Sequence, residues 1–202
     1  MSNFAPPALV YAHHVLRPNF NVYYPLVRGL ANAAAQQSIN RTLIQETNNL
    51  IARQGYPQNP LADVTAQFEV KMNEREILSI TLINYTFAGG AHGMTVQKSF
   101  TWNTTSGRLY SLGDLFKPGA PYVRRLSELV RKQIAARDLP LLDEFKGIAP
   151  DQDFYLADKV LVLYFQLYDL VPYAYGFPYF PISVYDIQDI IDEEGPLGKM
   201  VY

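Results

Sequence analysis

The chain of 202 residues contains no cysteine. Disulfide bonds, thiolate metal sites and a cysteine nucleophile are therefore excluded. The sequence therefore does not indicate whether the protein works in an oxidising or a reducing compartment, because a protein without cysteine is compatible with either side of a membrane.

A strong net charge is also missing. The chain has 17 Lys and Arg residues against 19 Asp and Glu residues, a formal net charge of −2 at pH 7. This balance gives no overall attraction towards nucleic acid, so no nucleic-acid partner is expected. The basic residues from Arg124 to Arg137 could contact an anionic polymer such as a wall teichoic acid, although a solvated helix face also explains them.

Long apolar segments are absent as well. The apolar run at 160–164 has the length of a strand, whereas a membrane-spanning helix needs about 20 apolar residues. Residues 1–19 are interrupted by His13, His14 and Arg17 and do not have the form of a secretory signal. No membrane insertion is predicted, and the chain alone predicts a cytoplasmic location by default.

Histidine is scarce, and its spacing does not favour a metal site. His13 and His14 are neighbours in a predicted strand, so their side chains point to opposite faces. No H-x-x-x-H pattern, nucleophile elbow or dinucleotide fingerprint is found. We therefore expect no metal, no cofactor and no enzymatic activity.

His92 is the one histidine in a setting that could favour chemistry, because it lies in the loop Gly89-Gly90-Ala91-His92-Gly93. A histidine among glycines could approach a substrate closely. A tight connection that needs positive φ angles explains the same pattern without any catalytic role.

Aromatic residues are abundant, with 15 Tyr, 11 Phe and one Trp. Tyrosine combines an apolar ring with a polar hydroxyl, so it suits half-buried strands and also recognition surfaces.

The apolar patterns predict an α+β fold of antiparallel sheets packed on helices, in two closely associated lobes at 1–90 and 91–202. Strands are predicted at 8–17, 20–27, 64–72, 77–87, 94–102, 109–112, 154–156 and 160–170. Pro25 is expected to end pairing in the second of these. Helical patterns occupy 30–53, the segment that Pro118 and Pro121 open, and 182–191, and the tail from residue 193 is expected to fray.

The order of motifs resembles a known family. The chain carries Tyr85-Thr86-Phe87-Ala88-Gly89-Gly90-Ala91-His92-Gly93, then Leu112-Gly113-Asp114-Leu115-Phe116, and later Pro172-Tyr173-Ala174-Tyr175-Gly176. Over residues 8–192 this looks like the RsiV-like family, tandem domains of unknown function found in RsiV-type anti-sigma factors and beside peptidoglycan deacetylase domains. The resemblance implies an α+β fold, an extracytoplasmic location and ligand recognition at the bacterial cell envelope. In the RsiV branch the recognised partner is lysozyme.

An aromatic, proline-stiffened segment at 172–181 is the predicted recognition surface. Its rings cannot all face inward in so short a segment, and aromatic side chains on a stiff loop lose little entropy on binding. Alternatively, they seal the end of the sheet against the last helix. The candidate ligand-binding residues are Pro172, Tyr173, Tyr175, Phe177, Tyr179 and His92.

The leading hypothesis is a non-enzymatic binding module of the cell-envelope sensor type. Through the aromatic segment it would recognise a lysozyme-like protein or a cell-wall glycan. Two alternatives belong to other classes: a cell-wall hydrolase that uses His92 and an acid, and an intracellular protein-interaction domain.

Overall fold

The computed structural model describes residues 6–59 and 61–201. It divides into two compact units, Met1–Leu109 and Tyr110–Tyr202. The strand that follows the glycine-rich loop, β5 (Met94–Asn103), pairs with β4 (Ile77–Phe87). For this reason the first unit extends past residue 90, where the sequence pattern placed the boundary.

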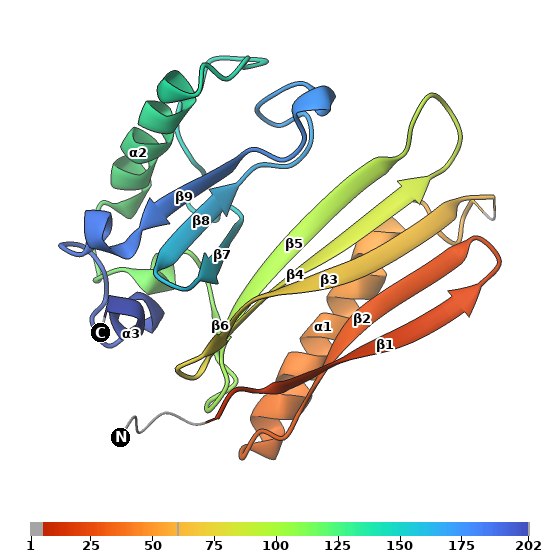
Figure 1. The fold of residues 1–202 in the computed structure, drawn as a ribbon, viewed down its shortest axis with the longest axis horizontal. Coiled ribbons are helices and arrows are strands. Elements are labelled where there is room, and N and C mark those ends of the chain that lie inside the picture. The colour runs from red at the N-terminus through yellow and green to blue at the C-terminus, as the bar shows by residue number, and fades with distance from the viewer. Residues whose placement is uncertain (1–5, 60, 202) are drawn as a thin grey trace. The chain divides into compact units, whose positions relative to one another are not determined.

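The first unit is a mixed sheet with one long helix (Figure 1). The six strands lie in the order β1-β2-β3-β4-β5-β6. The remaining elements are β1 (Leu9–Arg17), β2 (Phe20–Arg28), α1 (Ala33–Arg53), β3 (Asp63–Glu74) and β6 (Leu109–Tyr110). The neighbouring strands β2 and β3 pair in parallel, whereas β1–β2, β3–β4 and β4–β5 are antiparallel. The parallel pair arises because α1 carries the chain back to the start of the sheet before β3 begins.

Pro25 does not end β2, contrary to the sequence-based expectation, since the strand continues to Arg28. Both backbone polar groups of Val27 bond with the Asn40 side chain on α1, so they point away from β1. Backbone groups two residues apart in a strand point the same way, so the position of Pro25 also faces away from β1. The missing N–H of Pro25 therefore removes no hydrogen bond between β1 and β2.

The α1 helix has clear end signals. The Asn32 side chain accepts hydrogen bonds from the amides of Ala34 and Ala35, which is a standard N-cap. Gln54 closes the other end, and Gly55 follows with a φ of +95°. The buried stripe consists of Ala35, Ile39, Leu43, Thr47, Leu50 and Ile51.

The core of the first unit lies between α1 and the sheet. Ile39 and Leu43 from the helix meet Leu78 and Ile80 from β4 and Trp102 from β5. Burial of these large side chains supplies the main stabilisation of the unit. The antiparallel β3–β4 hairpin thus packs against α1. This confirms the prediction from the alternating apolar residues of the strands and the helical spacing of apolar residues in α1.

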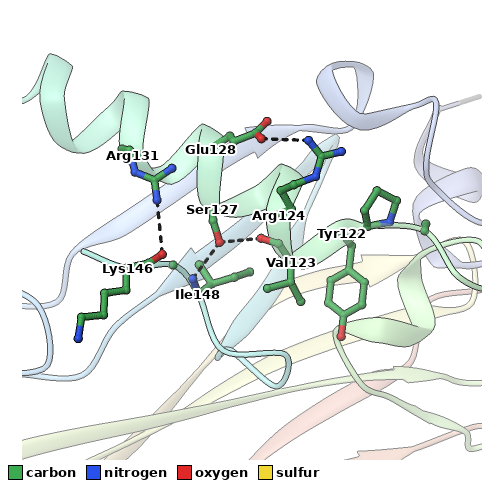
Figure 2. Close-up of a pocket in the computed structure, with 11 residues that line it drawn as sticks. Tyr122, Val123, Arg124, Ser127, Glu128, Arg131, Lys146 and Ile148 are labelled. Carbon is green, nitrogen blue, oxygen red and sulfur yellow. Dashed lines mark hydrogen bonds and ion pairs between the residues drawn. The ribbon is translucent and has the colours of Figure 1, made fainter. Parts of the chain in front are cut away.

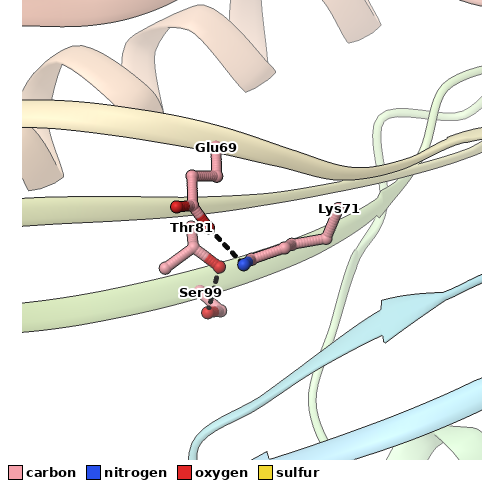
Figure 3. Close-up of polar contacts among 4 residues, drawn as sticks. All are labelled: Glu69, Lys71, Thr81 and Ser99. Carbon is pink, nitrogen blue, oxygen red and sulfur yellow. Dashed lines mark hydrogen bonds and ion pairs between the residues drawn. The ribbon is translucent and has the colours of Figure 1, made fainter. Parts of the chain in front are cut away.

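The face of β4 opposite α1 carries Ser79 and Thr81 between apolar residues such as Ile77 and Ile83, and both hydroxyls pair with side chains of β5. Ser79 Oγ lies 2.9 Å from Thr101 Oγ1, and Thr81 Oγ1 lies 2.8 Å from Ser99 Oγ. Figure 3 shows the second pair beside the ion pair between Glu69 and Lys71 on β3. Cross-strand polar pairs of this kind stabilise the register of a sheet.

The second unit is a three-stranded antiparallel sheet in the order β7-β8-β9. Its elements are the 3-10 helix η1 (Gly113–Leu115), α2 (Tyr122–Ala136), β7 (Phe154–Ala157), β8 (Val160–Tyr164), η2 (Tyr173–Tyr175), β9 (Tyr179–Ser183), η3 (Val184–Ile187) and α3 (Pro196–Val201). One sheet face is fully apolar and buried; it carries Phe154, Leu156, Leu161, Leu163, Phe180 and Ile182. The α2 helix contacts β9 and bonds with it: Gln133 Nε2 donates to the Pro181 carbonyl at 2.8 Å, and Arg137 Nη1 donates to the Tyr179 carbonyl at 2.7 Å.

Three sequence-based predictions for this unit are wrong. The strand expected at 160–170 ends at Tyr164, because a turn follows in which Tyr168 has a φ of +69°. The helical pattern at 182–191 forms only the end of β9 and the short η3. The tail was expected to fray, yet residues 196–201 are helical because tertiary packing buries Leu197 and Met200.

Candidate functional site

A long loop, residues 165–178, connects β8 to β9. The amide of Phe165 donates to the carbonyl of Pro178 at 3.3 Å and closes the base of the loop. Leu170, Val171 and Pro178 are buried and tie the loop to the unit. Connections of this length in a compact domain are uncommon and are often binding loops.

The backbone of the loop is well defined around η2. The amide of Tyr175 donates to the Pro172 carbonyl at 2.9 Å, and the amide of Gly176 donates to the Tyr173 carbonyl at 3.0 Å. Gly176 then adopts φ 68° and ψ −153°, a combination open almost only to glycine. The turn thus holds Tyr173 and Tyr175 in one arrangement.

The aromatic side chains of the loop divide into exposed and packed groups. Tyr175 is 60% exposed and Tyr168 is 46% exposed. Tyr173 is half-buried, and its ring centroid lies 5.5 Å from that of Tyr168. Phe177 is half-buried, with its ring 6.4 Å from that of Tyr179.

Tyr179 and Phe180, which sequence analysis assigned to the loop, belong to β9. Tyr179 is half-buried, and its ring lies 5.9 Å from that of Tyr164. Phe180 is fully buried and packs edge-on against Phe165 at 5.7 Å. Phe180 therefore seals the unit, whereas Tyr175 is presented to solvent.

An acidic segment lies beside this loop. The amide of Leu142 donates to the Leu170 carbonyl at 3.0 Å. This bond places exposed Leu142, Asp143 and Glu144 next to the loop, which itself carries exposed Asp169. We call the exposed side chains of Leu142, Asp143, Glu144, Tyr168, Asp169 and Tyr175 the loop surface. The sequence did not point to Leu142, Asp143 and Glu144, because only a tertiary hydrogen bond brings that segment to the loop. It did not point to Tyr168 and Asp169 either, because the apolar pattern predicted a strand there.

His92 lies in the first unit, on the connection between β4 and β5. It is exposed, and its Nδ1 lies 2.9 Å from the carbonyl oxygen of Gly93. Gly89 and Gly90 both have positive φ angles, of +99° and +97°. A Cβ on Gly93 would lie 2.4 Å from the Tyr85 ring, so this glycine makes room for that ring. These glycines are thus explained by the backbone conformation of the loop and by the space that the Tyr85 ring occupies.

A hollow of about 430 Å³ lies between β2 and α1 in the first unit. Phe20, Tyr24 and Tyr56 form its aromatic walls, and Val22 and Ile51 form its apolar floor. Sequence analysis did not single out this hollow. Its residues come from separate elements, and nothing in their spacing marks them as neighbours.

Two kinds of feature are missing from the described residues, 6–59 and 61–201. In this part of the chain, no three or more His, Asp or Glu side chains gather as metal ligands would. No helix within the same residues has the length and apolar character needed to cross a membrane.

Two family models match the chain. Residues 17–95 match the family described as deacetylase PdaC, and residues 113–185 match the family described as protein of unknown function (DUF3298). The chain joins a PdaC domain to a DUF3298 domain. His92 lies in the PdaC domain and the 165–178 loop in the DUF3298 domain.

Two curated proteins of Bacillus subtilis (strain 168) are similar to the pair of domains. The peptidoglycan-N-acetylmuramic acid deacetylase PdaC is 26% identical over 196 residues, which cover 87% of this chain and 39% of the deacetylase. The anti-sigma-V factor RsiV is 26% identical over 189 residues, which cover 86% of this chain and 65% of RsiV. These matches confirm the resemblance to RsiV-like proteins that the motifs indicated. The chain spans less than two thirds of the length of either relative.

Solved structures of DUF3298 family proteins share the fold. A protein from Bacteroides fragilis superimposes with a TM-score of 0.68 at 13% identity, covering 96% of this chain and 95% of that one. A protein from Pseudomonas aeruginosa PAO1 gives a TM-score of 0.67 at 16% identity, covering 92% and 94%. The predicted α+β class is thereby confirmed.

Proposed function

We propose that this protein is a non-enzymatic binding module of the cell-envelope sensor type and that its loop surface recognises a lysozyme-like protein. The proposal rests above all on Tyr175, a large ring that is 60% exposed on a loop whose backbone is held at both ends. Similarity to RsiV supports a sensor role, and similarity to PdaC supports a location at the cell envelope.

The loop surface has the features of a protein-binding anchor. Tyrosine offers a large contact area with few rotatable bonds, and a preorganised loop loses little entropy when it binds. The neighbouring Leu142, a residue that is 47% exposed, adds apolar area.

The charge of the loop surface favours a basic partner. Asp143, Glu144 and Asp169 are exposed around the tyrosines and give the loop surface three carboxylates. Complementary charge accelerates encounter and selects between partners. A basic protein is therefore the first candidate, and a cell-wall glycan, whose sugar rings could stack on the tyrosine rings, is the second.

The test is isothermal titration of the protein with lysozyme and with soluble peptidoglycan fragments. Tyr175→Ala should weaken binding by about 2 kcal/mol or more, or roughly 30-fold, as loss of an anchor does. Tyr185→Ala is the matched control, because Tyr185 is 52% exposed in the same unit but lies outside the loop.

Three results would contradict the proposal. The first is a wild-type protein that binds neither lysozyme nor the peptidoglycan fragments. The second is an equal loss of affinity in Tyr175→Ala and Tyr185→Ala. Release of acetate or of new reducing ends from peptidoglycan by this chain would contradict the non-enzymatic part. Saturable binding to the fragments alone would replace the lysozyme-like partner by a glycan.

A further inference from the structure

A pocket of about 540 Å³ lies along the first turns of α2, within the DUF3298 domain (Figure 2). One wall is the helix from Tyr122 to Arg131, and the other is the segment 146–148. None of its lining residues belongs to the loop surface.

A buried serine holds the two walls together. Ser127 Oγ donates to the Val123 carbonyl at 2.6 Å and accepts the Ile148 amide at 3.0 Å. Gly147 has a φ of +153°, and a Cβ there would lie 3.1 Å from Ser127 Oγ. The close approach of the segment to the helix therefore depends on glycine at 147 and serine at 127, and it gives the pocket a fixed shape.

The lining of the pocket is basic. Arg124, Arg131 and Lys146 carry three positive charges against the single carboxylate of Glu128, although the whole chain has a net charge of −2. Glu128 pairs with Arg124, with 3.3 Å between Oε1 and Nη1. Among the described residues, neither Arg131 nor Lys146 forms a salt bridge with a carboxylate.

Arg131 is positioned by its surroundings. Its guanidinium lies over the ring of Phe145, 5.6 Å from the centroid, and its Nη2 lies 3.5 Å from the Lys146 carbonyl oxygen. Figure 2 shows Arg131 and Lys146 at one end of the pocket and Tyr122 at the other. One end thus offers the Arg131 guanidinium, with the side chain of Lys146 extending outward from the segment beside it, and the other end offers an aromatic ring.

We propose that this pocket binds a phosphate group carried by a small polyol or sugar. A guanidinium presents a planar fork of donors that matches phosphate oxygens, and the flexible lysine adds a mobile point charge. Pockets of about 300–1,000 Å³ are typical of small-molecule sites, so this one has room for the polyol as well. The proposal is independent of the function of the loop surface.

The experiment is an NMR chemical-shift titration with inorganic phosphate, glycerol 3-phosphate and poly(glycerol phosphate). Sodium chloride at equal ionic strength and uncharged glycerol are the blanks. Saturable shifts are expected at the amides of Gly147 and Ile148. Arg131→Gln and Lys146→Gln should each weaken binding by about tenfold, the usual effect of losing a charged hydrogen bond.

Lys132→Gln is the matched control, because Lys132 is an exposed cation on α2 that does not line the pocket. Tighter binding of glycerol 3-phosphate than of inorganic phosphate would support the polyol phosphate, and equal affinity for these two probes would contradict the polyol part of the proposal. Tighter binding of the polymer per phosphate would identify a phosphate polymer as the source.

The proposal fails if no phosphate probe gives saturable shifts or if Lys132→Gln loses as much affinity as the pocket variants. Thermal melts check that each variant is folded. If Arg131→Gln unfolds through its contact with Phe145, then Lys146→Gln, whose side chain is exposed, still decides the question.

Discussion

The side-chain amide of Asn40 on α1 bonds with both backbone polar groups of Val27 on β2. Its Oδ1 accepts the Val27 amide at 2.7 Å, and its Nδ2 donates to the Val27 carbonyl at 2.9 Å. β3 pairs with β2 only from Phe20 to Val22, so among the described residues no strand bonds with Val27 on this side. One helix side chain thus takes the place of a neighbouring strand.

Asn40→Ala should lower the free energy of unfolding of the first unit by about 2 kcal/mol, because two part-buried backbone groups lose their partner. Denaturant unfolding followed by fluorescence of Trp102 measures this, since Trp102 is the chain's only tryptophan and is 1% exposed. Asn48→Ala, at an exposed position of the same helix, should change stability by no more than about 0.5 kcal/mol. Similar losses in both variants would show that the bonds to Val27 contribute little.

Gly107→Ala should destabilise the first unit by about 3 kcal/mol. Gly107 has a φ of +77°, and a Cβ there would lie 2.8 Å from the Cα of Ala35, a backbone atom that cannot move aside easily. Gly55→Ala is the control, with a φ of +95° and open space around the added Cβ; its cost should be about 1 kcal/mol, from the backbone conformation alone. Equal costs for the two substitutions, measured by the same Trp102 fluorescence, would mean that the overlap with Ala35 is relieved.

Ser127→Ala should cost the second unit about 1–3 kcal/mol, because the Ile148 amide would be buried without an acceptor. Hydrogen exchange at that amide should become faster in the variant, and this local readout separates loss of the bond from a general change. The control is Lys132→Ala on the exposed side of α2. Unchanged exchange at Ile148 would show that another group accepts its N–H.

Phe180→Ala and Tyr175→Ala should affect the second unit very differently. Phe180 is fully buried, so its truncation should cost about 3–5 kcal/mol. Tyr175 is exposed, so its truncation should change stability by no more than about 0.5 kcal/mol. Thermal melts of the two variants test this, and a large loss with Tyr175→Ala would mean that the loop is structural.

The sequence singled out the segment that carries Tyr175, but not the other five residues of the loop surface. Prolines and aromatic residues at 172–181 indicated a stiff segment, and the structure places η2 and exposed Tyr175 there. Composition could not separate exposed Tyr175 from buried Phe180, since both are aromatic residues within five positions of each other. The separation follows from β9, in which Phe180 pairs with Leu163 and faces the core.

The sequence by itself determined the helix 33–53 and the β3–β4 hairpin, because repeating apolar patterns and Asn, Gly or Pro at the ends act within a few residues of each other. Only the tertiary structure decided that β2 continues through Pro25, that residues 179–183 form a strand and that the tail folds as α3. It also decided that 142–144 joins the loop surface and that 146–148 closes a basic pocket on α2. Each of these depends on a hydrogen bond or on burial by residues distant in sequence, and local pattern carries no information about such partners.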